Sequence, residues 1–269
     1  MSPESPPPPA DDNPWVKAGR WATFLGRHAG RAVAAGYRAI DPDLRQHIAL
    51  TPLMGLTQLG RGDRTASAKP RDGHRPLLFV HGLAGQPGNF VGVRSYFRLR
   101  GRERQYAFPL ASGSIETMGK GLALRIREVL EINRLGSSAQ VDLVAHSMGG
   151  IVSRLALLDP QVAASVRSLV TLGTPHGGTW IARYADTHIT RALRPQSATL
   201  EALEAQLPWG SLPGYPSLFA FWSRADILLI PHESARVEGA MNVEVARSSH
   251  FGYLLRPSVW EQIYELLHG

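Results

Sequence analysis

Ser147 stands between an apolar run and a segment with helical apolar spacing, in the stretch VDLVAHSMGGIVSRLAL. A nucleophilic serine needs a hydroxyl that stands clear of the backbone, a base to take its proton, and donors for the oxyanion. A tight turn from strand to helix exposes the hydroxyl, and it requires small residues two positions away on each side. Ala145 and Gly149 occupy those positions. The pattern predicts a nucleophile at Ser147; the alternative is a serine that only caps the following helix.

The second stretch with chemical potential is FVHGLAGQPGNF, residues 79–90. A predicted strand ends there in His81 and Gly82, and the glycine-rich residues that follow can turn backbone N–H groups toward a reacting carbonyl oxygen. The helix that begins at Met148 directs the positive end of its dipole toward the same developing charge. Together the two stretches would supply the exposed hydroxyl and the oxyanion donors that a nucleophilic serine needs.

Five motifs together resemble the α/β-hydrolase lipases, specifically the small bacterial triacylglycerol lipases and esterases with an A-H-S-M-G nucleophile elbow. The matching strings are VHGLAG, VDLVAHSMGG, LVTLGTPHGG, the acid after FAFWSRAD, and SSHFGYLL. They span about residues 76–267 in the family's order of oxyanion loop, serine, acid and histidine. The resemblance implies an α/β-hydrolase fold with a mostly parallel sheet of about six strands, helices on both faces and a helical cap. The leading antiparallel strands of larger hydrolases are expected to be missing.

Carried onto this sequence, the resemblance makes Ser147 the nucleophile and His250 the general base. The backbone N–H groups of Leu83 and Met148 would form the oxyanion hole. Asp226 follows the predicted strand SLFAFWS and precedes His250, so two strand ends can bring these residues together. It would hold the imidazole tautomer and stabilise the imidazolium. Glu233 is the rival acid, but it lies further past the strand end.

The region around residues 175–216 is predicted to be a cap or lid insertion, because it is longer than in the smallest lipases. The residues expected to line the pocket or belong to the lid are His81, His146, His176, Trp180, Leu200, Leu203, Leu207 and Trp209. His176 could equally be structural. The helix with Leu200, Leu203 and Leu207 on one face could be a mobile lid or a packed surface helix, and the aromatic residues could be plain core.

Strands and helices alternate beyond residue 76, which predicts crossover connections and a mostly parallel sheet with helices on both faces. The expected strands are RPLLFVHG, RQYAFPL, QVDLVAHS, VRSLVTLGTP, SLFAFWSRAD and MNVEVARSSH. Helices are expected after Ser114, after Ser147 and at the C-terminus. We divide the chain into a proline-rich arm (1–14), an N-terminal helical segment (15–59), a linker (60–75) and a catalytic domain (76–269).

The N-terminal segment carries a stripe of arginines, formed by Arg20, Arg27, Arg31 and Arg38. It fits either a docked helix with a solvated arginine face or a basic helix that lies on a membrane. The start of the chain lacks the pattern of a signal peptide, and no apolar run approaches the length of a membrane span. As written, the sequence is expected to be cytoplasmic; a different true N-terminus would leave secretion open.

The composition limits the chemistry and the classes of binding partner that we expect for this protein. The chain of 269 residues has no cysteine, so disulfide and thiol chemistry are excluded. Its net charge is +7. No nucleic-acid-binding signature is present, and the arginine excess fits either genomic composition or attraction to anionic surfaces. We expect no cofactor and no metal site, although Asp186 and His188 are potential ligands. The sequence does not determine the oligomeric state.

The resemblance implies a serine ester hydrolase that cleaves lipid or other apolar acyl esters through an acyl-enzyme on Ser147. Its partner would be a lipid or small ester, with transient contact to a membrane or lipid–water interface as an option. An acyltransferase, or a deacylase of a lipid-anchored molecule, would use the same triad. A non-catalytic binding protein on this fold usually lacks a triad member, and all three candidates are present here.

Overall fold

A computed structural model describes residues 42–57, 67–110, 113–136, 138–207, 209 and 215–268. The chain divides into two compact units, residues 1–45 and 46–269. The predicted proline-rich arm, the arginine-striped segment and the first residues of the predicted linker lie outside the described residues. Of the first unit only residues 42–45 are described, at the start of helix α2 (Pro42–Thr57). The following account concerns the second unit.

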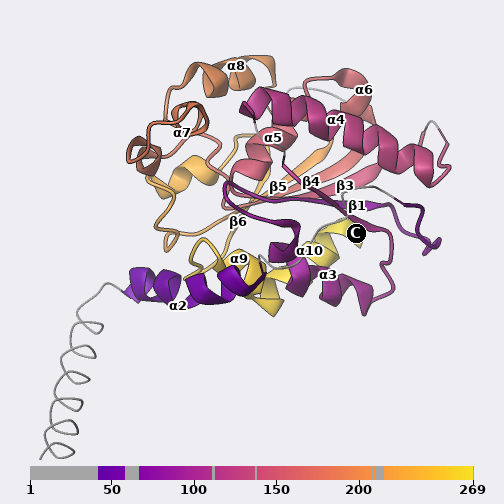
Figure 1. Ribbon diagram of the computed structural model, residues 1–269, viewed down its shortest axis with the longest axis horizontal. Helices are drawn as coiled ribbons and strands as arrows, with labels where there is room; N and C mark the ends of the chain where they lie inside the picture. Colours follow the sequence, from indigo (N-terminus) through magenta and orange to yellow (C-terminus); the bar gives the residue numbers. More distant parts are fainter. Residues whose placement is uncertain are drawn as a thin grey trace, which may run out of the picture. The chain divides into compact units, whose positions relative to one another are not determined.

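A six-stranded sheet forms the centre of this unit, in the order β2-β1-β3-β4-β5-β6 (Figure 1). Every pairing between neighbouring strands is parallel. The strands are β1 (Leu77–Val80), β2 (Gln105–Phe108), β3 (Val141–His146), β4 (Val166–Leu172), β5 (Ser217–Trp222) and β6 (Met241–Glu244). The predicted fold class and all six predicted strands are confirmed, and the described residues contain no antiparallel strand before β1.

The strands form where short apolar runs are buried on both faces, as in parallel sheets covered twice. Successive side chains point to opposite faces, so β1 contributes to two separate cores. Leu78 and Val80 pack on one face of the sheet, and Leu77 and Phe79 pack on the other. Because both sets of side chains are buried, a shift of β1 by one residue would exchange the two cores. The alternation therefore fixes the register of β1 against β2 and β3, and with it the position of the loop that follows β1.

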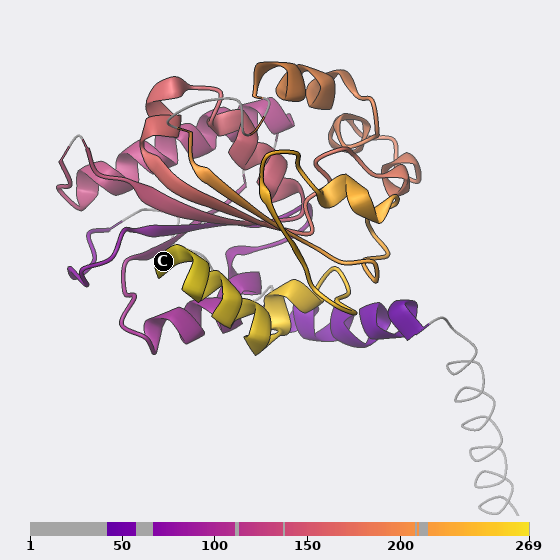
Figure 2. The same ribbon diagram turned by 180° about the vertical axis from the view of Figure 1, so that it is seen from behind.

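Helices cover both faces of the sheet, as Figures 1 and 2 show from opposite sides. The first face carries α4 (Ile115–Ile132), α5 (Met148–Ala156), α6 (Pro160–Ala164) and α8 (Ala198–Gln206). The second face carries α3 (Val91–Arg98), α9 (Gly252–Leu255), α10 (Pro257–His268) and Met54 of α2. Short segments complete the fold: η1 (Pro87–Phe90), η2 (Trp180–Arg183), η3 (His232–Ala235) and α7 (His188–Ala192).

Local signals place the helix starts. Ser114 precedes α4, and its hydroxyl accepts a hydrogen bond from the Thr117 N–H at 3.2 Å, which satisfies one free donor of the first turn. Asp159 caps α6 in the same way, and Pro160 follows at the first helical position, where its missing N–H is harmless. The sequence analysis did not identify α3, a short helix whose core face consists of Val93 and Phe97, four residues apart. Across the described parts of the chain, no helix combines the length and apolarity needed to span a bilayer.

Candidate active site

The predicted catalytic residues all lie at the carboxyl edge of the sheet. Leu83 follows β1, Ser147 follows β3, Asp226 follows β5 and His250 follows β6. Because parallel strands all end at this edge, the fold gathers residues that are far apart in the sequence. This edge is therefore where the sequence-predicted residues can act together.

The turn at Ser147 has the backbone strain of a nucleophile elbow. Ser147 has φ 55° and ψ −130°, a backbone conformation that residues other than glycine rarely adopt. A Cβ at Gly149 would lie 2.4 Å from the Val80 carbonyl oxygen, and one at Gly82 would lie 2.7 Å from the Ser147 Cβ. Both glycines are thus required by the close approach of α5 and the serine to the end of β1.

Two hydrogen bonds to the backbone of Ser147 hold this strained residue in place. The Ser147 N–H donates to the Leu172 carbonyl at 2.9 Å, and the Thr174 hydroxyl donates to the Ser147 carbonyl at 2.8 Å. Thr174 also fills the space beside Gly150, where an added Cβ would collide with its side chain. The end of β4 therefore fixes the elbow from the opposite side to β1.

Asp226 and His250 form a buried pair. His250 Nδ1 lies 2.9 Å from Asp226 Oδ2 and 3.1 Å from Oδ1, and the exposed fractions are 4% for His250 and 0% for Asp226. With a carboxylate as partner, Nδ1 carries the proton, so Nε2 of the neutral ring is left as the acceptor that a general base needs. The rival Glu233 lies in η3, and its side chain has no such contact with His250 among the described residues.

Gly173 makes room for this pair at the end of β4. Its φ is +55°, and an added Cβ would lie 2.9 Å from Asp226 Oδ2 and 3.3 Å from His250 Nδ1. The ring of Tyr253 packs against the same glycine, and burial followed by the charge of Asp226 raises the pKa of the Tyr253 phenol well above its usual value. The phenol beside Asp226 therefore stays neutral.

The backbone N–H groups of Leu83 and Met148 flank the serine. Within the described part of the chain, neither N–H donates to another protein group. Met148 is the first residue of α5, so the positive end of that helix dipole adds to its donor strength. Leu83 directly follows Gly82, which stands against the Ser147 side chain. Two unpaired donors beside a serine suit the stabilisation of an oxyanion.

His81 holds the loop that carries Leu83. Its Nδ1 donates to the Gly82 carbonyl at 2.9 Å, and its Nε2 accepts from the Leu110 N–H at 3.3 Å. Burial lowers the pKa of this imidazole below its usual value, in agreement with a neutral ring that donates on one side and accepts on the other. The side chain thus ties the loop to the segment that follows β2.

His146 connects the elbow to the loop of the base. Its Nε2 donates to the His250 carbonyl at 2.9 Å, and the centroids of the two rings lie 4.6 Å apart. Burial, followed by the proximity of His250, holds the pKa of His146 well below its usual range. A neutral ring at this position steadies the backbone of His250 without placing a second positive charge beside it.

Helix α2 reaches the same loop, a contact that the sequence analysis did not predict. The Gln46 side chain accepts a hydrogen bond from the Ser249 N–H at 3.1 Å. The ring of His47 stacks on Phe251, with centroids 4.8 Å apart. A glutamine and a histidine on a weakly patterned helix carry no sequence signal for such a role.

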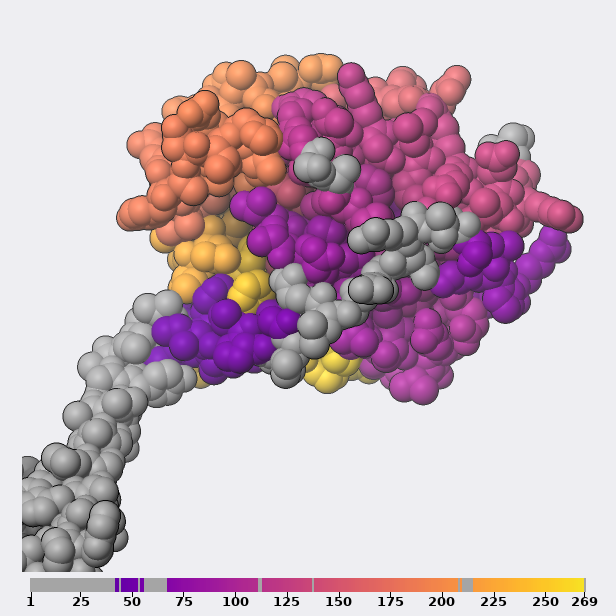
Figure 3. All heavy atoms as spheres, viewed as in Figure 1, coloured from indigo at the N-terminus to yellow at the C-terminus, as the bar shows by residue number. Residues whose placement is uncertain are grey.

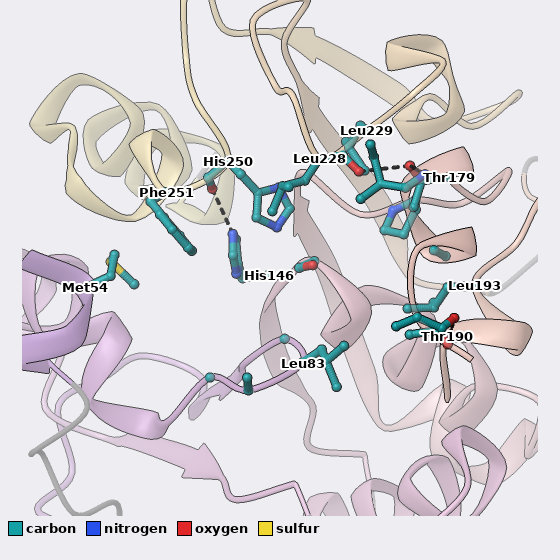
Figure 4. A pocket seen from close by; sticks show the side chains of 18 of the residues that line it. Met54, Leu83, His146, Thr179, Thr190, Leu193, Leu228, Leu229, His250 and Phe251 are labelled. Atoms are coloured by element: carbon teal, nitrogen blue, oxygen red, sulfur yellow. Dashed lines mark hydrogen bonds between the residues drawn. The ribbon is translucent and has the colours of Figure 1, made fainter. Parts of the chain in front are cut away.

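A cavity of about 560 Å³ opens onto Ser147 and His250. In Figure 4, Met54 and Phe251 lie on one side of His146 and His250, while Thr190 and Leu193 lie on the other. Further wall residues come from η2, from the loop before η3 and from the loop after β1; they include Ile181, Leu228, Leu229, Leu83 and Ala84. The mainly apolar walls suit an acyl chain more than a polar group.

Most of the residues predicted to line the pocket do not lie on the wall of the cavity. Of these residues, His146 lines the cavity, whereas His81, His176 and Trp180 do not; Leu83, predicted for the oxyanion hole, is also part of the wall. Leu200, Leu203, Leu207 and Trp209 are buried in the core beside α4 and α5, and the cavity walls do not include them. Trp180 is 39% exposed, and the Arg183 guanidinium lies 4.0 Å from the centre of its ring. Trp180 and Trp209 therefore do not line the cavity, whereas Tyr184 of the same region does.

Helix α8 is bonded to helix α5 and does not line the cavity. Arg154 of α5 is 1% exposed, and its Nη2 donates to Glu204 at 2.8 Å and to the Leu207 carbonyl at 3.1 Å. His176 lies beside this guanidinium and contacts the Thr171 hydroxyl at 3.1 Å. Burial, followed by the charge of Arg154, holds the pKa of His176 well below its usual range.

The α7–α8 segment also contacts α4. The Thr199 hydroxyl donates to Glu116 at 2.9 Å, and the His188 ring donates to the Gly113 carbonyl at 2.8 Å. Figure 3 shows the orange atoms of this segment beside the magenta atoms of α4. Asp186 is paired with Arg191 and Arg194 instead of with His188. No cluster of three or more potential metal ligands occurs among the described residues.

Comparison with known proteins extends this picture. The PGAP1-like alpha/beta domain family matches residues 113–194. A triacylglycerol lipase of Burkholderia plantarii is 30% identical over 173 residues, which cover 60% of this chain and 44% of the lipase. A GPI inositol-deacylase of Cryptococcus neoformans is 62% identical over 37 residues, or 14% of this chain and 5% of that protein. The chain thus spans less than half the length of these relatives.

Solved structures show the same architecture. The mature form of the Bacillus licheniformis lipase BlEst2 superposes with a TM-score of 0.62 at 19% identity, over 76% of this chain and 96% of the lipase. An identity this low establishes the fold and not the reaction. The chain therefore has the α/β-hydrolase fold, with partial sequence similarity to triacylglycerol lipases.

Proposed function

We propose that the protein is a serine carboxylic-ester hydrolase that cleaves lipid or other apolar acyl esters through an acyl-enzyme on Ser147. The observation that carries the proposal is the buried Asp226–His250 pair beside a strained serine, with both Ser147 and His250 on the wall of one apolar cavity. The similarity to triacylglycerol lipases over 60% of the chain supports the same reaction class.

In the acylation half-reaction, Ser147 Oγ attacks the ester carbonyl and His250 Nε2 accepts the serine proton. The carbonyl π electrons move to the oxygen, where the N–H groups of Leu83 and Met148 stabilise the negative charge. Asp226 stabilises the imidazolium that has formed. When the intermediate collapses, the bond to the leaving oxygen breaks and His250 gives its proton to the departing alcohol. The acyl group remains on Ser147.

Deacylation repeats these steps with water as the nucleophile. His250 takes a proton from the water, the hydroxide adds to the acyl carbonyl, and the same two N–H groups hold the second oxyanion. Collapse of this intermediate breaks the bond to Ser147 Oγ, which recovers its proton from His250. The products are a carboxylic acid and the free enzyme, and no cofactor is required.

We assign the catalytic domain to residues 76–269 and the cap to about residues 175–216. Within the cap, η2 and α7 contribute walls of the cavity, whereas α8 is bonded to the buried Arg154. Any lid movement is accordingly assigned to η2 and α7, and α8 is assigned a fixed structural role. Lipid–water interfaces are the expected place of action for a long-chain substrate.

The direct test is hydrolysis of p-nitrophenyl esters across a series of acyl lengths, for the parent chain and Ser147→Ala together. We expect turnover by the parent with a preference for longer chains, and a loss of about 10⁴-fold or more in the variant. Leu124→Ala, a change at an exposed position on α4, is the control for handling and expression. Failure of the parent to hydrolyse any chain length would overturn the proposal.

A second candidate is a deacylase or acyltransferase that acts on a lipid-anchored molecule with the same triad. It is favoured by the 37-residue similarity to a GPI inositol-deacylase and by the PGAP1-like match. Transfer separates from hydrolysis in an assay in which alcohols such as glycerol or inositol compete with water, and a deacylase separates from a simple esterase by its preference for an acylated, lipid-anchored substrate over p-nitrophenyl esters. Partition of the acyl group to the alcohol at the expense of free acid favours transfer, and unchanged acid release favours hydrolysis.

A further inference from the structure

A second cavity lies at the amino edge of the sheet, away from the serine. It has a volume of about 160 Å³ and is lined by Gly73, His74, Arg75, Arg102, Leu267 and His268. These residues precede β1, precede β2 or end α10. The volume is below the 300–1,000 Å³ typical of pockets for drug-sized ligands, so only a small group fits.

The charges around this cavity do not balance. Arg75 and Arg102 both pair with one carboxylate, Asp142 of β3, which is 0% exposed. Arg75 Nε lies 3.2 Å from Asp142 Oδ2, and Arg102 Nη2 donates to the same oxygen. The nearby Asp72 is already paired with Arg104 at 3.0 Å. Among the described residues, two guanidinium groups therefore share one carboxylate, which leaves an excess of one positive charge there.

Arg102 is the least satisfied member of the cluster. Its side chain is 1% exposed, and its Nε and Nη1 have no hydrogen-bond partner in the described part of the chain. Burial lowers the pKa of this guanidinium from its ordinary value, although arginine stays charged in proteins. Buried cations are normally paired, because an unpaired charge in a protein interior is costly.

The remaining walls supply an opening and a further imidazole, whose free nitrogen accepts a hydrogen bond when the ring is neutral. Arg75 is 41% exposed, so the cavity is accessible from solvent on its side. His268 Nδ1 donates to the Tyr264 carbonyl, which leaves Nε2 available, and the rings of His74 and His268 meet edge to face at 4.8 Å. Burial is the main cause that lowers the pKa of His268, and the positive charge of Arg102 adds to it.

We propose that this cavity binds a phosphate group, either as inorganic phosphate or as a small phosphate monoester. Arginine recognises tetrahedral oxyanions through paired N–H donors, and a dianion would more than compensate the excess charge around Asp142. The site is separate from the ester-cleaving residues, which lie at the other edge of the sheet. It therefore provides a binding function beyond the proposed hydrolysis.

The test is calorimetric titration of the full chain with inorganic phosphate and, separately, with glycerol 3-phosphate, at constant ionic strength in chloride. We expect saturable binding of one equivalent with a Kd of about 1 mM or lower. Tighter binding of inorganic phosphate would indicate a free anion as the ligand, and tighter binding of glycerol 3-phosphate would indicate a headgroup. No saturable binding of either compound up to about 20 mM would overturn the proposal.

Variants locate the site. Arg75→Gln should weaken phosphate binding about tenfold, whereas Arg98→Gln, which removes an equal charge from a surface pair with Glu103, should leave it unchanged. Because loss of Arg75 also disturbs Asp142, His268→Gln at an exposed position provides a second probe, with a weakening of about threefold. Equal effects of Arg75→Gln and Arg98→Gln would show attraction by net charge only and would refute the site.

Discussion

The two edges of the central sheet place polar groups in the protein interior in opposite ways. At the carboxyl edge, the buried carboxylate of Asp226 meets the imidazole of His250, and burial lowers the pKa of the neighbouring His146. The strained serine lies beside them, with two N–H groups nearby that have no partner among the described residues. At the amino edge, the buried carboxylate Asp142 is shared by two guanidinium groups. Strand β3 serves both edges, since Asp142 lies near its start and Ser147 follows its end. Neutral but strained groups suit proton transfer, whereas fixed charges suit binding and stability.

Removing the charge of each of the two carboxylates in turn should separate these roles most clearly. Asp226→Asn should lower kcat/KM for ester hydrolysis about 10⁴-fold, because His250 loses the partner that fixes its tautomer. Asp142→Asn should instead lower the free energy of unfolding by about 3–5 kcal/mol, because the buried Arg102 loses the carboxylate with which it is paired. Both are measured by steady-state kinetics and urea denaturation on the same samples.

The control for this pair is Asp186→Asn, which changes an exposed ion pair with Arg191 and Arg194 and should alter neither quantity. Loss of activity in folded Asp142→Asn that matches the loss in Asp226→Asn would break the distinction between the edges.

A glycine on each side of β3 offers the next contrast. Gly149→Ala should lower the free energy of unfolding by about 2–3 kcal/mol, since the new Cβ would lie 2.4 Å from the Val80 carbonyl oxygen. Gly136→Ala, in the loop that leads into β3, has no atom within 4 Å of the new Cβ and should change stability by less than about 0.5 kcal/mol. Thermal unfolding measures both; comparable losses would contradict the close packing at the elbow.

The pH dependence of stability gives the smallest expected effect. His146 and His176 have folded-state pKa values well below their usual value of 6.5, so the unfolded chain binds more protons just below pH 6.5. Their stabilising contribution is therefore present above that pH and declines as the pH falls below it, by up to about 1.4 kcal/mol per pH unit for each group. His176→Gln should reduce the slope between pH 6.5 and 5 in denaturant titrations. Identical slopes for the parent and the variant would exclude His176 as a contributor.

Much of the carboxyl edge could be predicted from the sequence. The strands are short apolar runs, and the elbow imposes small residues at fixed offsets, so the sequence predicts the six strands and the tight turn at Ser147 that the structure contains. The order of the acid and the base along the chain pointed to Asp226 and His250, which the structure brings within hydrogen-bond distance of each other. These features depend on local sequence patterns or on the order of the strands, and both can be inferred from a single sequence.

The walls of the cavity and the amino edge could not be predicted in this way. Met54 lines the cavity through a helix with little amphipathic pattern, and Leu200 and Leu203 belong to the core although their spacing fits a lid equally well. Arg75, Arg102 and Asp142 are separated by 27 and 40 residues in the sequence, and no motif links them. Arginines in an arginine-rich chain give no signal until the fold shows which of them are buried.

The most direct test of the account is covalent trapping with a p-nitrophenyl alkylphosphonate, which phosphonylates an activated serine and mimics the tetrahedral intermediate. Intact mass and peptide mapping should show one adduct per chain, located on Ser147 and absent from Ser147→Ala. His250→Ala should slow its formation by about 10³-fold or more, because the serine loses its general base. An adduct on another residue, or a rate that His250→Ala leaves unchanged, would contradict a Ser147–His250–Asp226 mechanism.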